Sequence, residues 1–183
     1  MSLERFQIYK YSYPFADKVN PSLHRFIVEN ASVEDPLVPG TMQTVFQSKK
    51  FASTKEFQLL IEYIKSLVLN IKYYIPPKNL QCKLELINWW GMIYNKGHFQ
   101  INHTHPPAHW AFVYYINTPK GSSPLVFNKI NKKIIPKSGE VVIFPAWTPH
   151  QVPPNRCEGR SSFVGNFMWN LGLDQQLFVN DAI

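Results

Sequence analysis

Residues 98–117, HFQINHTHPPAHWAFVYYIN, decide the fold class. This stretch joins a polar, histidine-rich segment to an aromatic, β-branched one across a Pro-Pro pair. Short segments of this kind, bounded by Gly, Pro, Asn or Ser, are typical of strands. Four more follow the same pattern: LELINWWGMIY (84–94), SPLVFN (123–128), EVVIFP (140–145) and RSSFVGNFMWN (160–170). Several short strands at this spacing predict an all-β sandwich or barrel, with the jelly roll among the options.

The first half of the chain has helical signals. Asn20 before Pro21 predicts a helix start, with Asn20 as the cap. Ser53 and Glu56 fit a capping box, and the apolar residues behind them recur at helical spacing: Phe57, Leu60, Ile61, Ile64, Leu67, Val68 and Ile71. We therefore expect one domain over residues 1–183, mainly β with flanking helices. Residues 1–80 form a helical or irregular support region, and residues 84–170 form the β core.

Composition excludes several classes of protein. The chain has 183 residues, of which 45% are hydrophobic and 17% charged, as in a globular domain. No apolar run approaches the roughly 18 residues that span a bilayer, so no membrane association is expected. The first residues lack the apolar core of a secretion signal. Cys82 and Cys157 are expected to be free thiols in a reducing compartment, which favours a cytoplasmic protein.

The chain is basic, with a formal net charge of +7. One group of lysines lies at Lys129, Lys132, Lys133 and Lys137, and another at Lys49 and Lys50. Such groups usually form a solvated edge. The other interpretation is attraction of an anionic partner, either a nucleic acid or an acidic small molecule. No nucleic-acid-binding motif accompanies the charge.

Histidines carry the clearest chemical signal. Five of the six lie between positions 98 and 150. On a strand, His103 and His105 project to the same face while Thr104 points away, so both imidazoles can bind one metal ion. A third ligand has to come from a neighbouring strand, and His150, directly after an apolar strand, is well placed for it. The pair by itself is a weak signal, because surface or supporting histidines can show the same spacing.

The last strand adds a second signal. Alternation along RSSFVGNFMW puts Arg160, Ser162, Val164 and Asn166 on one face. Burying an arginine with no acidic residue nearby in sequence costs free energy unless an anionic ligand binds to it. A carboxylate is a suitable ligand, because a guanidinium binds it through two hydrogen bonds. Tyr114, on the strand HWAFVYYIN, can offer its phenol to the same anion.

The stretch from Asn88 to Asn170 resembles the 2-oxoglutarate and Fe(II)-dependent oxygenases. It is most similar to a branch common in marine bacteria and their phages, and more distantly resembles the prolyl hydroxylases. The resemblance rests on NWWGMIYNKGHFQINHTHPP (88–107), on VYYIN (113–117), on SGEVVIFP (138–145) followed by Trp147 and His150, and on Arg160 with Ser162 two residues later.

This resemblance implies a double-stranded β-helix, that is, a jelly roll, with Fe(II), 2-oxoglutarate and O2 as cofactor and co-substrates. It implies that His103, His105 and His150 hold the metal. It also implies that Tyr114, Arg160 and Ser162 bind 2-oxoglutarate. Asn166, which faces inward on the last strand, is a further candidate for binding this co-substrate. The expected activity is hydroxylation of an unidentified substrate with release of succinate and CO2. A phage-encoded member would work in the host cytoplasm.

One departure from the wider superfamily concerns the metal. Most members have His-x-Asp or His-x-Glu where this chain has His103-Thr104-His105. Three neutral imidazoles leave the full charge of a divalent ion, and they also suit zinc. Two alternatives therefore stay open: a three-histidine metalloenzyme without 2-oxoglutarate (a dioxygenase or zinc hydrolase), and a non-catalytic jelly-roll interaction module.

Other residues receive weaker predictions. His98 and His109 flank the pair and could touch substrate, although each is more often a loop or core histidine. Glu85 and Glu140 could complete a metal site but lie farther from the pair in the pattern. The five tryptophans are expected to fill the barrel and its rim: Trp89, Trp90, Trp110, Trp147 and Trp169. The substrate stays open, with an anionic or nucleic-acid-associated one favoured by the charge, and a homodimer is possible.

Overall fold

The computed structural model describes residues 7–31, 33–34, 42–72 and 82–171. Its strands are β1 (Tyr9–Ser12), β2 (Val33–Glu34), β3 (Met42–Phe46), β4 (Cys82–Tyr94), β5 (Gln100–His103), β6 (Trp110–Asn117), β7 (Leu125–Phe127), β8 (Lys132–Ile134), β9 (Glu140–Pro145), β10 (His150–Val152) and β11 (Arg160–Leu171). Its helices are α1 (Ala16–Asn30), α2 (Lys49–Ala52), α3 (Lys55–Asn70) and a 3-10 turn, η2 (Asn128–Ile130).

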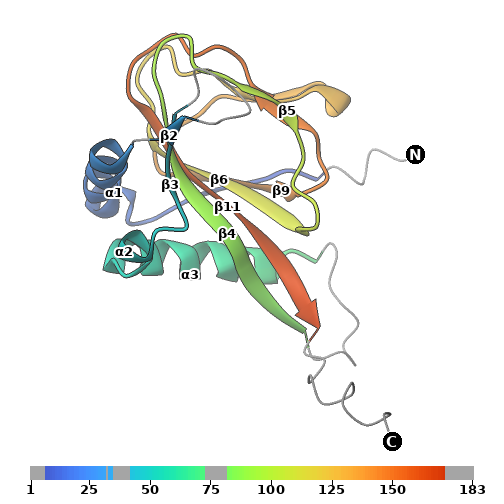
Figure 1. The fold of residues 1–183 in the computed structure, drawn as a ribbon. Coiled ribbons are helices and arrows are strands. Elements are labelled where there is room, and N and C mark those ends of the chain that lie inside the picture. Colours follow the sequence, from blue (N-terminus) through green and yellow to red (C-terminus); the bar gives the residue numbers. More distant parts are fainter. Residues whose placement is uncertain (1–6, 32, 35–41, 73–81, 172–183) are drawn as a thin grey trace, which may run out of the picture.

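The strands form two antiparallel sheets. The larger has the order β1-β9-β6-β11-β4-β3-β2, and the smaller has the order β5-β10-β7-β8. β4 and β11 pair along their whole length at the centre of the large sheet (Figure 1). From β4 to β11 the chain passes back and forth between the two sheets, with β7 and β8 consecutive in the small one, as in a jelly roll. The predicted fold class is confirmed.

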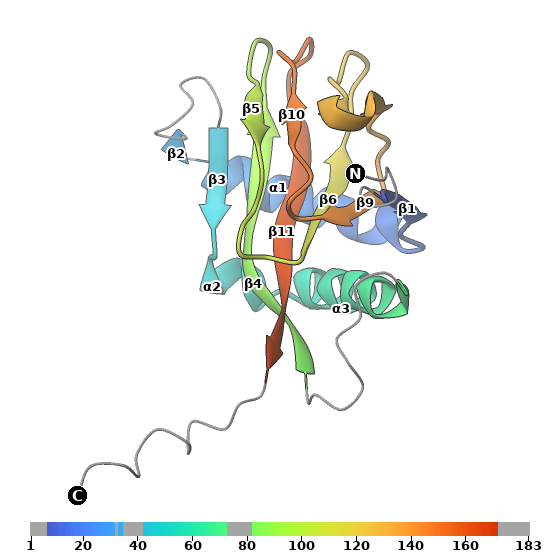
Figure 2. The ribbon, with the colours of Figure 1, turned by 90° about the vertical axis from the view of Figure 1, so that its right-hand side faces the viewer.

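Helices α1 and α3 cover one face of the large sheet, and the small sheet lies on its other face (Figure 2). Each face has its own apolar core. Helix residues such as Leu23, Ile27 and Ile64 pack with Phe112 and Phe163 in the first core. Residues of both sheets, among them Val113, Phe127 and Phe144, form the second. The large sheet is therefore buried on both faces.

Two helix starts differ from the prediction. α1 begins at Ala16, and Asn20 is buried inside it, where its amide donates to the Ile116 carbonyl (3.0 Å). Asn20 serves this tertiary contact instead of capping the helix. α3 begins one residue later than the capping box implied, because Thr54 accepts the hydrogen bond from Phe57 N and Ser53 belongs to the end of α2.

The N-terminal region also contributes strands that the prediction of a helical or irregular support region left out. β1 pairs with β9, and β3 pairs with β4, so both extend the large sheet at its two ends. Residues 73–81 of that region, like residues 1–6, lie outside the described part of the chain.

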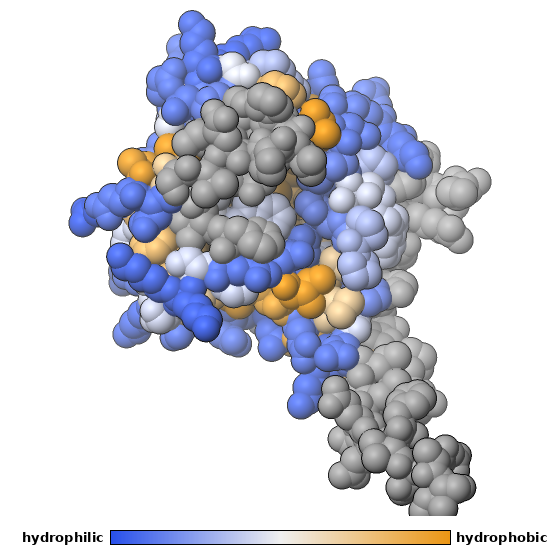
Figure 3. Space-filling model, in the orientation of Figure 1, coloured by the Kyte–Doolittle hydropathy of each residue, from blue (hydrophilic) through white to orange (hydrophobic). Residues whose placement is uncertain are grey.

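The surface in Figure 3 is mainly hydrophilic, with apolar residues in small separate patches. None of the described helices is both long and apolar enough to cross a membrane. Both cysteines are free thiols, as predicted.

Candidate active site

Three histidines come together in the small sheet, at the end of β5 and the start of β10. β5 ends at His103, and His105 follows it after one residue. β10 begins at His150 and pairs antiparallel with β5, so that His150 lies directly opposite His103. A backbone hydrogen bond from His105 N to the Ala146 carbonyl (2.8 Å) fixes the turn after β5 against the chain leading to β10. The structure therefore brings all three predicted ligands together.

The three imidazoles are close enough to bind one ion. One nitrogen of each ring lies within 4.8 Å of the others, and the Nε2 atoms of His105 and His150 are 3.2 Å apart. Two nitrogens at this separation could both bind one divalent ion, since metal–imidazole bonds are about 2.1 Å long. No other such cluster of His, Cys, Asp and Glu occurs in the described residues.

Backbone carbonyls set the orientation of two of the rings. His103 Nδ1 lies 2.8 Å from the Ile101 carbonyl, and His150 Nδ1 lies 2.9 Å from the Thr148 carbonyl. A carbonyl can only accept, so Nδ1 carries the proton in each ring and Nε2 keeps its lone pair. This is the supporting contact that metal-bound histidines usually make.

The site favours neutral imidazoles. Burial lowers the pKa of His105 to about 3, with a further contribution from the neighbouring His150 and His103. Burial also lowers the pKa of His150 to about 4; His103 adds to this effect and the hydrogen bond to Thr148 opposes it. Only the neutral ring binds a metal, so both residues are in the ligating form at neutral pH.

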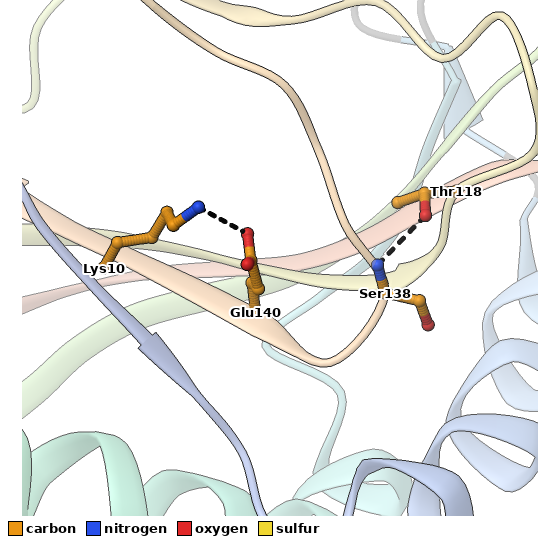
Figure 4. A network of polar contacts seen from close by, with 4 residues as sticks. All are labelled: Lys10, Thr118, Ser138 and Glu140. Carbon is orange, nitrogen blue, oxygen red and sulfur yellow. Dashed lines mark hydrogen bonds and ion pairs between the residues drawn. The ribbon is translucent and has the colours of Figure 1, made fainter.

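Neither of the two glutamates that were considered as ligands joins the cluster. Glu140 pairs with Lys10, with Nζ and Oε2 3.2 Å apart (Figure 4). Glu85 is exposed and accepts a hydrogen bond from Asn170 Nδ2 at 3.1 Å. The candidate metal site thus consists of three neutral donors, and it supplies no negative charge of its own.

Arg160 opens β11 and is 1% exposed. Its guanidinium lies over the ring of Tyr94, 4.5 Å from the ring centre, and 5.6 Å from that of Tyr115. Its Nε and Nη1 have no hydrogen-bond partner, and within the described chain no carboxylate lies within ion-pair distance of it. A buried cation without a counter-charge is costly, so this arrangement indicates a site for an anion.

One cavity joins the histidines and the arginine. Its volume is about 60 Å³, and its walls include His103, His105, His150 and Arg160. Ser162, Val164 and Asn166 also line it, as the alternation of β11 predicts. Asn166 donates to Asn88 Oδ1 at 2.6 Å, and its own Oδ1 is buried without a partner.

Tyr114 does not reach this cavity, and its prediction is corrected. It packs in the core under the helices, where its hydroxyl donates to Asn20 Oδ1 at 2.6 Å. Its neighbour Tyr115 points to the other face, beside Arg160, and its hydroxyl has no partner. Burial raises the pKa of Tyr115 to about 12, and the charge of Arg160 opposes that rise.

The other two histidines near the pair make structural contacts. His98 Nδ1 accepts from Asn95 N (3.1 Å), and His109 Nδ1 accepts from Trp169 N (3.1 Å). Three further residues line the cavity: Gln100 and Tyr94, which were not predicted as site residues, and Trp90, for which only a packing role was predicted. Tyr94 could have been found from its position at the end of an aromatic strand, whereas Gln100 had no signal.

Solved structures with this architecture are numerous, whereas no protein-family model and no curated protein sequence matches the chain. A Pseudomonas putida prolyl-4-hydroxylase superposes with a TM-score of 0.66 at 18% identity, covering 91% of this chain and 94% of that one. The collagen prolyl hydroxylase of Paramecium bursaria Chlorella virus-1, solved with 2-oxoglutarate, gives 0.65 at 15% identity over 88% and 93%. The chain therefore shares the fold of these two hydroxylases.

A third solved structure extends this comparison. HygX from Streptomyces hygroscopicus, solved with nickel, 2-oxoglutarate and hygromycin B, superposes with a TM-score of 0.62 at 13% identity over 92% of this chain and 87% of that one. The resemblance seen in the sequence is thus confirmed at the level of the fold.

Proposed function

We propose that this protein is an Fe(II)- and 2-oxoglutarate-dependent oxygenase that hydroxylates its substrate. One observation carries the proposal: a single cavity holds three imidazoles suited to a metal and a buried arginine that lacks an anionic partner. The oxygenase fold, and the presence of 2-oxoglutarate in two similar structures, support it.

The donor set fits a divalent transition metal. His103, His105 and His150 would hold Fe(II) through Nε2, because Nδ1 of His103 and of His150 is engaged with a carbonyl. Imidazole suits iron as well as zinc. Three neutral ligands leave the charge of the ion uncompensated, which favours an anionic co-substrate beside it.

The opposite wall fits a dicarboxylate. Arg160 offers Nε and Nη1, both buried and without partners, to a carboxylate. Each of these charged donors forms a stronger hydrogen bond with an anionic oxygen than a neutral N–H would. Tyr115 lies beside Arg160, and we assign its phenol to the role that the sequence suggested for Tyr114. We assign Ser162 and Asn166 to the same co-substrate because these two residues line the cavity.

Fe(II) and 2-oxoglutarate together supply the oxidising power to insert one oxygen atom of O2 into a substrate C–H bond, with succinate and CO2 as the other products. The chain's own residues bind, orient and exclude water. The carbonyls of Ile101 and Thr148 keep two imidazoles oriented. Phe144, Val152 and Val164 make the wall apolar, which limits the water that can compete for the site.

The test is an anaerobic titration of metal-free protein with Fe(II) and then with 2-oxoglutarate, followed by the visible metal-to-ligand charge-transfer band. We expect the band in the parent protein. We expect it to be lost in His105→Ala, which removes a ligand. In Arg160→Ala it should form only at a 2-oxoglutarate concentration roughly 100-fold higher, since a buried charged hydrogen bond is lost.

Two matched variants serve as controls. Thr104→Ala changes an exposed side chain between the two histidines, and Arg156→Ala removes an exposed arginine outside the cavity. Both should titrate like the parent. A protein that binds Zn(II) stoichiometrically and shows no response to 2-oxoglutarate would be a three-histidine metalloenzyme of another kind. A protein that binds no metal would be a non-catalytic module, and either result would overturn the proposal.

A further inference from the structure

The pairing of β5 with β10 is irregular beside the histidines. His150 lies opposite His103, but Val152 lies opposite Gln100. A step of two residues on β10 therefore matches a step of three on β5, so β5 has one extra residue between Gln100 and His103. Such a β-bulge changes the direction of the side chains on one side of it, and bulges are frequent next to active sites.

This bulge turns Gln100 into the cavity. In a regular strand, residues three apart point to opposite faces. Here Gln100 and His103 both line the same cavity, while Ile101 between them is 49% exposed. The bulge thus leaves one residue of β5 unpaired with β10, and it places the carboxamide of Gln100 beside the candidate metal ligands.

The carboxamide of Gln100 has an unused acceptor. Its Oε1 is buried and has no hydrogen-bond partner. A buried polar atom in this state costs free energy that a ligand with a donor group recovers. Asn166 Oδ1, in the same cavity, is a second buried acceptor without a partner. Arg160 supplies a donor for an anion, but no described side chain supplies one to these amide oxygens.

The lining also limits the charge of that donor. The described residues of the cavity include no aspartate or glutamate, and they include the cationic Arg160. Even with a divalent metal and the 2-oxoglutarate dianion bound, Arg160 leaves the site with a net positive charge, so an ammonium group would be unfavourable there. An uncharged N–H or O–H group carries no such penalty.

We propose that Gln100 is a specificity-determining residue whose carboxamide hydrogen-bonds an uncharged N–H or O–H group of the substrate, such as an amide. This inference rests on the proposed function, because it takes the space beside the histidines as the place where the substrate enters. It assigns a substrate class by its polar group, and it assigns the β5 bulge the task of presenting Gln100 to it.

The experiment uses three probes of similar size: propionamide, propionate and n-propylammonium. Each is titrated into the full chain loaded with Zn(II), a diamagnetic substitute for Fe(II), and with 2-oxoglutarate. Two-dimensional NMR follows the side-chain amide signals of Gln100, assigned from their loss in Gln100→Met. We expect propionamide to shift these signals in a saturable way and to bind more tightly than both charged probes. We expect Gln100→Met to weaken propionamide binding about five- to tenfold, the effect of one neutral hydrogen bond.

Gln151→Met is the matched control, because Gln151 lies on the adjacent strand β10 between two cavity residues and is absent from the cavity wall. It should bind propionamide like the parent. The proposal is overturned if propionamide shifts no Gln100 signal, if a charged probe binds as tightly, or if both variants lose affinity equally. Failure of the proposed function would appear separately, as the absence of any spectral response to Zn(II) and 2-oxoglutarate before a probe is added.

Discussion

The two faces of the large sheet are formed by the same strands, but one face is apolar and well packed while the other has buried polar groups without partners. On the face under α1 and α3, β11 contributes Phe163 and Phe167, both fully buried among aromatic and aliphatic side chains. On the face toward the small sheet, the same strand contributes Arg160, Ser162 and Asn166, and several of their polar atoms have no partner.

Two consecutive tyrosines of β6 show the same difference. Tyr114 on the helix-covered face donates to Asn20, whereas the hydroxyl of Tyr115 on the cavity face is buried and unpaired. Both residues are 0% exposed, so burial alone does not separate them. The comparison indicates that the helix-covered face stabilises the fold, while the cavity face keeps groups that cost stability until a ligand binds.

The largest effect is expected on the helix-covered face. Phe163 packs edge-on against Phe51 and Phe57, with ring centres 5.6 and 5.3 Å away. Phe163→Ala should lower the free energy of unfolding by about 3–5 kcal/mol, because it removes a buried ring and leaves a cavity. Urea unfolding followed by circular dichroism measures this loss.

Val164→Ala is a smaller truncation on the cavity face, one residue further along β11. Val164 already borders a cavity, so its truncation removes fewer contacts and should cost less than half as much. Equal losses of unfolding free energy in the two variants would show that the cavity face is packed as tightly as the helix-covered face.

A smaller effect concerns pH and the metal-free protein. His105 and His150 have folded pKa values of about 3 and about 4, below the unfolded value of about 6.5. Between the folded and unfolded pKa values the unfolded chain binds more protons than the folded chain. The contribution of these two histidines to the free energy of unfolding is therefore fully present above pH 6.5 and is lost as the pH falls below it. Lowering the pH from 7 to 5 should cost about 2 kcal/mol for each histidine.

Urea unfolding at several pH values tests this slope. The double variant with His105→Gln and His150→Gln should lose most of it. His24, whose pKa burial also lowers, lies on α1 and hydrogen-bonds Ser161 on the helix-covered side of the sheet. If His24→Gln removed the slope instead, the pH-sensitive region would be the helix-covered face.

Arg160 allows a change in the opposite direction. Replacing the buried guanidinium by the apolar, similarly long side chain in Arg160→Met should raise the free energy of unfolding of the ligand-free protein by about 1–2 kcal/mol, because an unpaired charge is removed. Thermal unfolding with and without 2-oxoglutarate checks it. Saturating 2-oxoglutarate should stabilise the parent and leave the variant unchanged. A variant that is less stable without ligand would mean that the stacking on Tyr94 outweighs the cost of burial.

The sequence predicted the parts of the site where alternation is visible. His103 and His105 flank an exposed threonine, and β11 alternates between polar and aromatic residues. For both segments, the alternation therefore predicts which side chains point to the cavity. β6 is different, because residues 110–116 are all buried and the strand has apolar residues on both faces. No alternation shows which of Tyr114 and Tyr115 lies on the same side of the sheet as Arg160, and the prediction chose Tyr114, which packs in the core under the helices.

Gln100 and Asn20 were missed for reasons of tertiary structure. The bulge that aims Gln100 is defined by its pairing with β10, a strand some fifty positions later in the chain, and no local pattern encodes it. Asn20 before Pro21 has the local form of a helix cap, but its amide contacts Ile116 and Tyr114 across the core. In both cases a distant contact overrides the local signal.

The smallest effect separates the two tyrosines directly. Tyr114→Phe should lower the free energy of unfolding by about 1–2 kcal/mol, because Asn20 Oδ1 loses a donor in a buried site. Tyr115→Phe should change it by less than about 0.5 kcal/mol, since the hydroxyl that it removes has no partner in the ligand-free protein. The order should reverse for 2-oxoglutarate, whose affinity falls only in Tyr115→Phe if that phenol binds the same carboxylate as Arg160. Calorimetric titration and urea unfolding of both variants measure the two effects, and a loss of affinity in Tyr114→Phe alone would restore the role that the sequence suggested for Tyr114.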